Sequence, residues 1–556
     1  MTEKLNTIQE FIQNSFDAFS DQPALGFVND RMLSYSDIRS ALEQQVFRLA
    51  QLGIKQGDKV AILGTNGPNW VISYFSILCH GAVAVPILPD FTAQEIENVI
   101  LHSEARMVFV SEKLFSKLTD TAKAKVEKLF MLDNMGEIPL DASTKDLRKI
   151  EEFLPSGKMD ACLNKVMPDD LASIIYTSGT TGNSKGVMLS HKNLSTNLKQ
   201  CASIEQLDDN EVFLSILPLS HTLENTVGLL LPFAHGATIY YLDKPPTASV
   251  LLPALKKVRP TYLLSVPMVI EKIYKLQIKA KFNSSPVTRR LYRLPMIRKV
   301  LHKIAGKKLY ETFGGRLKFF GIGGAKLDAS TERFLSEAGF PYAIGYGLTE
   351  TAPMVAGDGV KGTRFQSTGR PVSSVEMKIH EPDPHTGEGE VWVRGENIMQ
   401  GYYKEPEATK KVLLKDGWFR TGDLGLLDKD NYLYIKGRIK NVIVGSSGEN
   451  IYPEEIESVI NRYSHVLESI VVKRDGKLIA LVHFNVDEIE KQFQHMKEEA
   501  RKHAEAKMEE LVTELKGFVN QRVNRFSQIK QVVAHIEPFE KTATKKIKRF
   551  LYFDNN

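Results

Sequence analysis

The chain has 556 residues, of which 42% are hydrophobic and 25% charged, and its formal net charge is +5. This length exceeds what one hydrophobic core usually organises, so we expect two or more domains. The small net charge gives no reason to expect nucleic acid as a partner, and three widely spaced cysteines form neither a disulfide framework nor a metal-ligand pattern.

The N-terminal part does not favour export, and one stretch within it resembles a membrane span. The start, MTEKLNTIQEFIQNSF, has acidic and polar residues where a signal peptide needs an apolar core. Residues 70–89 contain no Asp, Glu, Lys or Arg over 20 positions, the length of a span. His80-Gly81 interrupts this stretch and Pro86 and Pro89 close it, so a helix ending at Gly81 before a strand explains it better. We expect a soluble, cytoplasmic protein.

Strand-like and helical patterns alternate from residue 59 onward. Apolar strands at 59–63, 82–87 and 105–110 enclose helical segments at 68–81 and 92–104. A second run, from 211 to 267, repeats this order, and a third unit follows from 316 to 347. Short apolar strands that alternate with helices predict mostly parallel sheets covered on both faces. We interpret the first two runs as related α/β subdomains of one large N-terminal domain.

The pattern changes after about residue 430. Short strand candidates (YLYIKG, SIVVKRDGKLIALVHFN and VVAHIEPF) surround a long polar helix of roughly residues 486–525, which predicts a small α+β domain. The charged, glycine-containing segment KGRIKN (436–441) suits a hinge. We therefore predict an α/β fold with a large domain over 1–437 and a small mobile domain over 438–556.

A strongly basic segment lies between residues 272 and 318. It carries 14 Lys or Arg and a single acid, Glu311. Apolar residues in TRRLYRLPMIRKVLHKIAGKKLY recur at helical spacing and predict a basic amphipathic face. A solvated surface helix is the ordinary interpretation, and contact with anionic lipid or an acidic partner is the alternative.

The segment YTSGTTGNSKG (176–186) is dense in glycine and hydroxyl residues and lies between two apolar runs. Such a series lets backbone N–H groups point into one concavity, and Lys185 adds a cation, which is typical of a phosphate site. A simple hairpin would need only about two to five loop residues. The segment is not a Walker A loop, because Gly186 follows the lysine and a strand-like run replaces the expected helix.

YTSGTTGNSKG is similar to the phosphate loop of the adenylate-forming superfamily, which includes acyl-CoA synthetases, nonribosomal adenylation domains and luciferases. Six more motifs follow in that family's order: LPLSH (217–221), GIGGAKL (321–327), GYGLTE (345–350), TGD (421–423), GRIKNVIVGSSGENIYPEEIE (437–457) and KTATKKIKR (541–549). The resemblance therefore covers nearly the whole chain.

The resemblance implies a reaction in two steps that uses ATP, Mg²⁺ and coenzyme A. A carboxylate attacks the α-phosphate of ATP, giving acyl-AMP and pyrophosphate, and a thiol then displaces AMP. Because the first step brings an anion towards a polyanion, cations and fixed dipoles must be supplied.

The resemblance also implies which residues bind the nucleotide, in four groups. These are Thr177, Ser178, Gly179, Thr180, Thr181, Gly182 and Lys185 around the β- and γ-phosphates; Gly324, Ala325, Tyr346 and Gly347 near adenine; Thr349 at the α-phosphate; and Asp423 and Arg438 at the ribose. Taken alone, Tyr346 would more often be a core residue and Asp423 a turn residue.

Further roles follow from the same motifs. Glu350 would bind Mg²⁺, with Thr177, since hard oxygens suit magnesium. His221 would lie near the substrate carboxylate, although a lone histidine is more often structural. Gly345 would border the acyl tunnel and Lys440 would mark the hinge. The pantetheine channel would be lined by Gly445, Ser446, Ser447 and Gly448.

The last motif departs from the common form P-K-T-x-x-G-K of the family. Lys545 stands where glycine is usual, and no proline immediately precedes Lys541. The spacing still places Lys546 at the catalytic position, with Lys545 as the alternative. An ending of this kind, together with LPLSHTLENTVG, looks like the long-chain fatty acyl-CoA synthetases.

The sequence thus predicts an acyl-CoA synthetase for long- or medium-chain fatty acids, cytoplasmic and with an anionic membrane surface as a candidate contact. An acyl-carrier-protein ligase that uses the same adenylate is the nearest alternative. A non-catalytic nucleotide- or acyl-binding homologue is less consistent with the presence of Glu350, Asp423 and Lys546.

Overall fold

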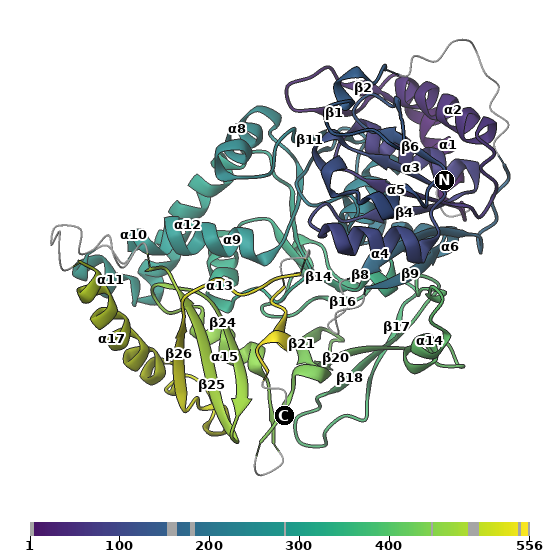
Figure 1. Cartoon of the computed structure of the whole chain (residues 1–556). Coiled ribbons are helices and arrows are strands. Elements are labelled where there is room, and N and C mark those ends of the chain that lie inside the picture. The colour runs from purple at the N-terminus through teal and green to yellow at the C-terminus, as the bar shows by residue number, and fades with distance from the viewer. Residues whose placement is uncertain are drawn as a thin grey trace.

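The computed structural model describes residues 5–152, 164–177, 184–282, 285–445, 449–486, 500–542 and 546–553. Figure 1 shows a large body, coloured purple to green, against which the yellow-green C-terminal part packs as a smaller body. This arrangement agrees with the predicted fold class of a large α/β domain and a small α+β domain.

The first large sheet has eight strands and contains the expected run of parallel strands. Its order is β19 (Gly401–Tyr402), β9 (Lys185–Ser190), β8 (Leu171–Thr177), β4 (Val83–Ile87), β3 (Lys59–Leu63), β5 (Met107–Val110), β6 (Lys128–Met131) and β7 (Glu137–Ile138). Strands β8, β4, β3, β5 and β6 are parallel, and β7, β9 and β19 pair antiparallel at the edges.

The second large sheet has nine strands and includes four that the sequence analysis did not assign, at residues 23–27, 33–34, 354–357 and 370–371. Its order is β16 (Arg370–Pro371), β15 (Met354–Gly357), β14 (Tyr342–Gly347), β13 (Phe319–Ile322), β12 (Tyr262–Ser265), β10 (Val212–Ser215), β11 (Thr238–Tyr241), β1 (Pro23–Phe27) and β2 (Leu33–Ser34). Strand β1 pairs parallel with β11, in the register Leu25 to Ile239. The N-terminal residues therefore complete the second subdomain, although the first subdomain follows them in the chain.

Helices cover both sheets, so that the large body is layered. One core lies between the two sheets and buries residues of α1 (Ile8–Phe19), α2 (Tyr35–Gln51), α3 (Pro68–His80), α6 (His191–Ala202) and α7 (Leu231–Ala234). A second core packs α4 (Ala93–Ser103) on the outer face of the first sheet. A third packs α8 (Ala248–Val258), α12 (Pro295–Thr312) and α13 (Ala329–Ala338) on the outer face of the second.

The apolar stretch 70–89 is buried between these layers. Helix α3 begins with Pro68 at its first turn and ends at Gly81, whose φ of +83° is the left-handed conformation that glycine adopts without strain. Strand β4 follows and is buried throughout. The prediction of a helix before a strand is confirmed. Within the described ranges, no helix is both long and apolar enough to cross a membrane.

A third, four-stranded sheet joins the two bodies. It consists of β17 (Glu376–His380), β18 (Gly389–Arg394), β20 (Phe419–Leu427) and β21 (Leu433–Arg438), all antiparallel. The segment YLYIKG, which the change of pattern grouped with the small domain, forms β21 and belongs to this sheet. Its pairing with β20 explains the difference, because Leu433 is fully buried in the core of the large body.

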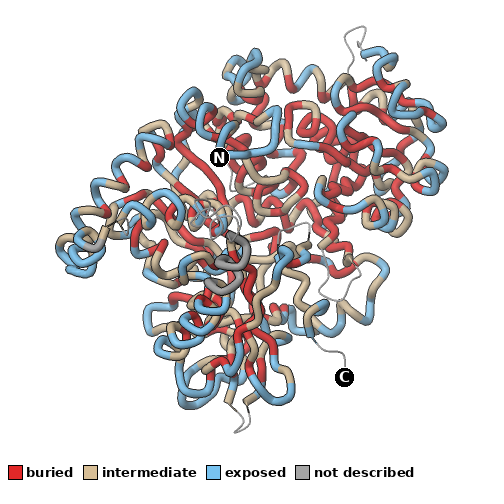
Figure 2. Tube along the Cα trace, turned by 60° about the vertical axis from the view of Figure 1, so that its left-hand side comes forward, coloured by how far each residue is buried: buried red, intermediate tan, exposed pale blue. Residues whose placement is uncertain are grey.

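The smaller body begins after β21. Strands β24 (Val466–Arg474), β25 (Lys477–Phe484) and β26 (Gln531–His535) form its sheet, preceded by the hairpin β22–β23 (Ile443–Val444 and Asn450–Ile451). Helices α15 (Pro453–Ile460) and α17 (Ala500–Asn520) complete it. Its buried apolar residues form clusters of their own, which run from Ile443 onward. Figure 2 shows buried segments inside both bodies, with exposed loops around each.

Candidate active site

Several predicted site residues follow strands of the nine-stranded sheet at the same edge. His221 lies in the turn region after β10, Gly324 follows β13, and Tyr346 ends β14. Glu350 lies in the short 3₁₀ turn that comes next. Carboxyl ends of parallel strands meet at one edge of a sheet, which is the usual ligand side of such folds. A methyl group at Gly323 would lie 3.1 Å from Leu223 Cδ2, so the GIGG motif meets the segment that directly follows LPLSH.

The predicted phosphate loop lies between the ends of two strands of the first sheet. Strands β8 and β9 pair antiparallel up to Thr177 and Lys185, which are Cα partners. This hairpin holds both ends of the segment at one place and confirms that a strand follows the lysine. Ser178, Gly179, Thr180, Thr181 and Gly182 lie outside the described residues.

Tyr402 connects the phosphate-loop hairpin to Glu350 and was missed by the sequence analysis. Its backbone pairs with Val187 of β9, and its hydroxyl donates to Glu350 Oε1 at 2.9 Å. The Lys185 ammonium lies 4.7 Å from the centre of the Tyr402 ring. Tyr402 stands in GYYK, which carries no signal by itself, because its function depends on pairing with a strand more than 200 positions earlier. It orients the carboxylate proposed to meet magnesium.

Asp423, Arg438 and Tyr346 form a hydrogen-bonded group around the buried carboxylate of Asp423. Asp423 and Arg438 are Cα partners in β20–β21, and Arg438 Nε lies 2.7 Å from Asp423 Oδ1. The Tyr346 hydroxyl donates to Asp423 Oδ2 at 2.6 Å. Burial raises the pKa of Asp423, while the charge of Arg438 opposes this shift and favours the carboxylate. The carboxylate keeps acceptor capacity beyond these two bonds, which suits it to bind further hydroxyl groups.

Lys546 comes from the smaller body and approaches this group. Thr542 N–H donates to Lys546 O at 2.8 Å, and Lys546 N–H donates to Thr542 Oγ1 at 3.2 Å, so Thr542 fixes the backbone at Lys546. Lost hydration, and then the charge of Arg438, lower the pKa of Lys546, whereas Asp423 and Glu350 raise it. Its ammonium is therefore near the carboxylates of both motifs. Lys545 lies outside the described residues.

His221 lies close enough to Lys546 for their charges to interact. Burial, and then the charge of Lys546, lower the pKa of His221 to about 4. Leu223 N–H donates to His221 Nδ1 at 3.3 Å, so Nδ1 is the unprotonated nitrogen. The neutral ring therefore carries its proton on Nε2 and can donate one hydrogen bond.

The small residues of the adenine and acyl motifs border these groups. A methyl group at Gly347 would lie 1.8 Å from Pro353 O, so only glycine fits there. At Gly345 it would meet the Met354 side chain at 3.0 Å, which leaves little space beyond the glycine on that side. Gly324 and Ala325 are exposed after β13, and Thr349 is half-buried.

The predicted hinge and channel residues lie where the two bodies join. Lys440 is exposed, in a single 3₁₀ turn (Ile439–Asn441) between β21 and β22. Gly445 N–H donates to Glu449 O at 2.8 Å, which places both ends of the intervening loop together. Ser446, Ser447 and Gly448 lie outside the described residues.

Charged contacts hold the small body against the large one. Arg462 Nε lies 2.5 Å from Asp328 Oδ2, and Lys326 Nζ lies 4.0 Å from Glu455 Oε1. Lys275 donates to the carbonyl of Asn461, just beyond the end of α15, and to that of Val466, the first residue of β24. Part of the basic segment 272–318 is thus turned towards the small body, where cations favour the carbonyl end of a helix.

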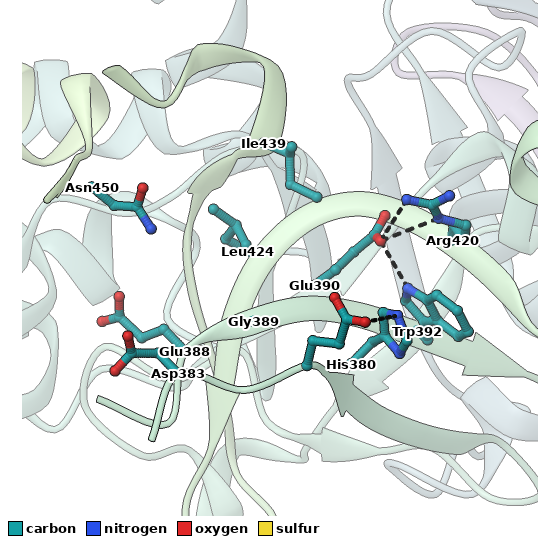
Figure 3. Close-up of a pocket in the computed structure, with 11 residues that line it drawn as sticks. His380, Asp383, Glu388, Gly389, Glu390, Trp392, Arg420, Leu424, Ile439 and Asn450 are labelled. Carbon is teal, nitrogen blue, oxygen red and sulfur yellow. Dashed lines mark hydrogen bonds and ion pairs between the residues drawn. The ribbon is translucent and has the colours of Figure 1, made fainter. Parts of the chain in front are cut away.

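A cavity of about 510 Å³ lies beside the hinge (Figure 3). Leu424 and Ile439, the chain neighbours of Asp423 and Arg438, line it together with Asn450 of the small body. The carboxylate of Glu390 in this cavity already has partners, since Trp392 Nε1 donates to it at 2.8 Å and the Arg420 guanidinium lies 3.1 Å from it. None of the residues that line it belongs to the proposed catalytic group.

Comparison with known proteins identifies the family. The family model described as AMP-binding enzyme matches residues 12–403, more than half of the chain. The chain belongs to the AMP-binding enzyme family. "Fatty acyl-CoA synthetase A" of Dictyostelium discoideum is 30% identical over 530 residues, covering 88% of this chain and 79% of that protein.

Two further similarities broaden the range of relatives of this AMP-binding enzyme. "Long-chain-fatty-acid--[acyl-carrier-protein] ligase AEE15, chloroplastic" of Arabidopsis thaliana is 29% identical, over 78% of this chain and 70% of that protein. The structure of o-succinylbenzoate coenzyme A synthetase from Bacillus subtilis, solved with ATP and magnesium ion, superposes with a TM-score of 0.73 at 21% identity. It covers 97% of this chain and 98% of that one and supports the fold.

The residues present fit a magnesium ion that arrives with nucleotide phosphates. Among the described residues, no group of three or more His, Cys, Asp or Glu could hold a metal by itself. Magnesium bound with phosphates needs only one or two protein carboxylates and keeps phosphate and water oxygens as its other ligands. Glu350, oriented by Tyr402, and the Thr177 hydroxyl supply such hard oxygens.

The low pKa of His221 predicts the pH dependence of this AMP-binding enzyme. An ordinary histidine titrates near about 6.5, but His221 should stay neutral down to about pH 4. The kcat/KM for adenylate formation should therefore show no inflection between pH 6 and 7, since kcat/KM reports groups of the free enzyme. Pyrophosphate release measured from pH 5 to 8 checks this. An inflection near 6.5 that disappears in His221→Gln would show that His221 titrates normally and contradict the expectation.

Proposed function

We propose that this protein is an ATP-dependent acyl-CoA synthetase that activates a long- or medium-chain fatty acid through acyl-AMP and transfers it to coenzyme A. The observation that carries the proposal is that Lys546 of the small body lies close enough to Asp423 and Glu350 of the large one for their charges to interact. A cation in this place suits a reaction that joins two anions, the fatty acid carboxylate and ATP. The names of curated relatives as fatty acyl-CoA synthetases and ligases support the class of substrate.

In the proposed first step, a carboxylate oxygen of the fatty acid attacks the α-phosphorus of ATP and the bond to pyrophosphate breaks. Asp423 would accept hydrogen bonds from the ribose hydroxyls and so fix the nucleoside. His221 would donate from Nε2 to the fatty acid carboxylate. Lys546 would neutralise charge shared by the carboxylate and the α-phosphate, where it increases during the reaction. Magnesium, held by Glu350, would supply charge neutralisation at the phosphates.

In the proposed second step, the thiol sulfur of coenzyme A attacks the carbonyl carbon of acyl-AMP, AMP leaves, and the thiol proton is released. We propose that the small domain (438–556) turns relative to the large one (1–437) about Lys440 between the steps. The rotation would withdraw Lys546 and bring the loop from Gly445 to Gly448 towards the thiol. The exposed, single-turn connection at Lys440 and the separate hydrophobic cores support this part of the proposal.

Chain length is the property that an assay should resolve first. We expect kcat/KM to rise with the acyl chain up to about twelve carbons or more, because each buried CH₂ adds up to about 0.8 kcal/mol until the tunnel is full. Pyrophosphate release with a panel of carboxylates, with and without coenzyme A, measures this. A maximum at acetate or at an aryl acid such as coumarate would overturn the substrate class while leaving adenylate formation intact.

The acceptor thiol distinguishes a second function, that of an acyl-carrier-protein ligase. Its support is the relative from Arabidopsis thaliana whose name states that activity. Both functions share the adenylate, so the first half-reaction cannot separate them. Acyl transfer to coenzyme A and to a phosphopantetheinylated carrier protein, measured side by side from the same acyl-AMP, does so.

A further inference from the structure

The helices α11 (Pro286–Tyr292) and α12 expose a concentration of large apolar side chains. In the described part of the chain, twenty large apolar side chains are exposed, and six of them fall within residues 287–304. They are Val287, Leu291, Leu294, Met296, Val300 and Ile304, and we call them the apolar row. Scattered apolar residues are ordinary on a protein surface, but a contiguous group indicates a contact.

Helix α12 has two opposite apolar faces. His302, Gly306 and Leu309 are buried against the large body. Met296, Val300 and Ile304 recur every four residues on the other side and are 83%, 57% and 64% exposed. Successive residues of an α-helix are about 100° apart, so this second face points directly away from the first. Packing against the protein therefore leaves the row uncovered.

Basic residues border the apolar row. Four exposed lysines of α12 lie close to this row in the sequence: Lys299, Lys303, Lys307 and Lys308. No Asp or Glu occurs from residue 285 to 310. Arg298 differs from these exposed lysines, because its guanidinium pairs with Glu337 at 2.7 Å. An apolar row flanked by lysines is the arrangement with which a helix lies in the interface of an anionic bilayer.

Helix α11 is fixed beside α12 by polar contacts on its inner side. The Tyr292 hydroxyl lies 2.8 Å from His302 Nε2 and 3.1 Å from the Tyr274 hydroxyl. Val287 and Leu291, four residues apart, are exposed on its other side. Figure 1 shows α11 and α12 on the left-hand side of the molecule.

We propose that the surface formed by the apolar row and Lys299, Lys303, Lys307 and Lys308 binds the face of an anionic phospholipid membrane. The apolar side chains would insert at the level of the headgroups, and the lysines would contact lipid phosphates. The protein would then lie on the bilayer without crossing it. The surface is separate from the proposed catalytic residues, so binding requires no turnover.

Flotation of the full-length protein with vesicles tests the proposal. We expect binding to phosphatidylcholine mixed with phosphatidylglycerol, weaker binding to phosphatidylcholine alone, and a decrease as salt rises. The combined variant Lys299→Gln, Lys303→Gln and Lys307→Gln should bind anionic vesicles at least about tenfold more weakly, since each lysine near the surface contributes. Met296→Ala, Val300→Ala and Ile304→Ala combined should weaken binding by at least about tenfold as well.

Matched variants on other surfaces provide the controls. Lys411→Gln, Lys415→Gln and Lys429→Gln make the same change in charge at exposed positions elsewhere and should leave binding unchanged. Equal binding by all variants, or by neutral and anionic vesicles, would overturn the proposal. A third result would also overturn it: the wild-type protein does not bind vesicles, sediments as a dimer, and loses the dimer in the apolar variant. The surface would then bind a second copy of the chain. The assay does not depend on the proposed reaction, so either idea can fail alone.

Discussion

Lys546→Ala is expected to lower carboxylate-dependent pyrophosphate release by at least about a hundredfold, which corresponds to about 2.7 kcal/mol at about 1.36 kcal/mol per tenfold. The reason is that its ammonium lies near Asp423 and Glu350, and close enough to His221 to lower the pKa of that ring. We propose that it is the cation that the small body contributes where carboxylate and α-phosphate would meet. Initial rates at saturating ATP and fatty acid measure the effect.

The second half-reaction separates a chemical role of Lys546 from a structural one. Given preformed acyl-AMP and coenzyme A, Lys546→Ala should form thioester at close to the wild-type rate, because the proposed rotation removes this residue before thiol attack. Lys545→Ala is the control at the neighbouring position and should affect adenylation far less. If Lys545→Ala proves the more damaging, the catalytic lysine is the other one. If Lys546→Ala slows both half-reactions together, the rotation does not apply.

Asp423→Ala is expected to lower kcat/KM for ATP by at least about a hundredfold, since each hydrogen bond to a charged group contributes roughly 1.5–3 kcal/mol. Two such bonds to the ribose would be lost. The same change removes the ion-pair partner of Arg438 and the acceptor of the Tyr346 hydroxyl. KM for ATP should rise more than kcat falls, because the nucleoside contact exists before and during the reaction.

Asp423→Asn and a measurement of unfolding serve as controls for that prediction. The amide keeps the shape and one acceptor oxygen, so the loss should be smaller than in Asp423→Ala. The side chain of Arg438 is 45% exposed, so water can replace its partner and the protein should remain folded. An unchanged KM for ATP combined with a large drop in Tm would instead assign Asp423 to structure alone.

Local patterns in the sequence were sufficient where a residue's neighbours in the chain decide its structure. Pro68 and Gly81 mark the ends of α3, and the apolar runs around them predict β3 and β4 as the structure has them. The strand after Lys185 was predicted for the same reason, since the apolar residues Val187, Met188 and Leu189 follow directly.

Contacts between distant segments were not predictable from these patterns. Strand β1 joins β11 across more than 200 residues, and a short run such as PALGF gives no information about its partner. Tyr402 reaches Glu350 only because β19 pairs with β9. The basic segment was predicted as one face, whereas Lys275 turns to the small body and Lys299 to solvent. Pairing of this kind depends on the whole fold.

The hydrophobic cores of the two bodies do not mix: the clusters of the large body end by Leu433 and those of the small body begin at Ile443. A change of orientation therefore leaves the packing of both intact and exchanges ion pairs such as Lys326–Glu455, whose side chains are 37% and 40% exposed. Such pairs contribute about 0–1 kcal/mol each, so two orientations can differ by only a few kcal/mol. Reversing a 1:99 population to 99:1 takes about 5.5 kcal/mol. A bound nucleotide and its products can supply that difference, and the occupancy of the site can thereby set which orientation dominates.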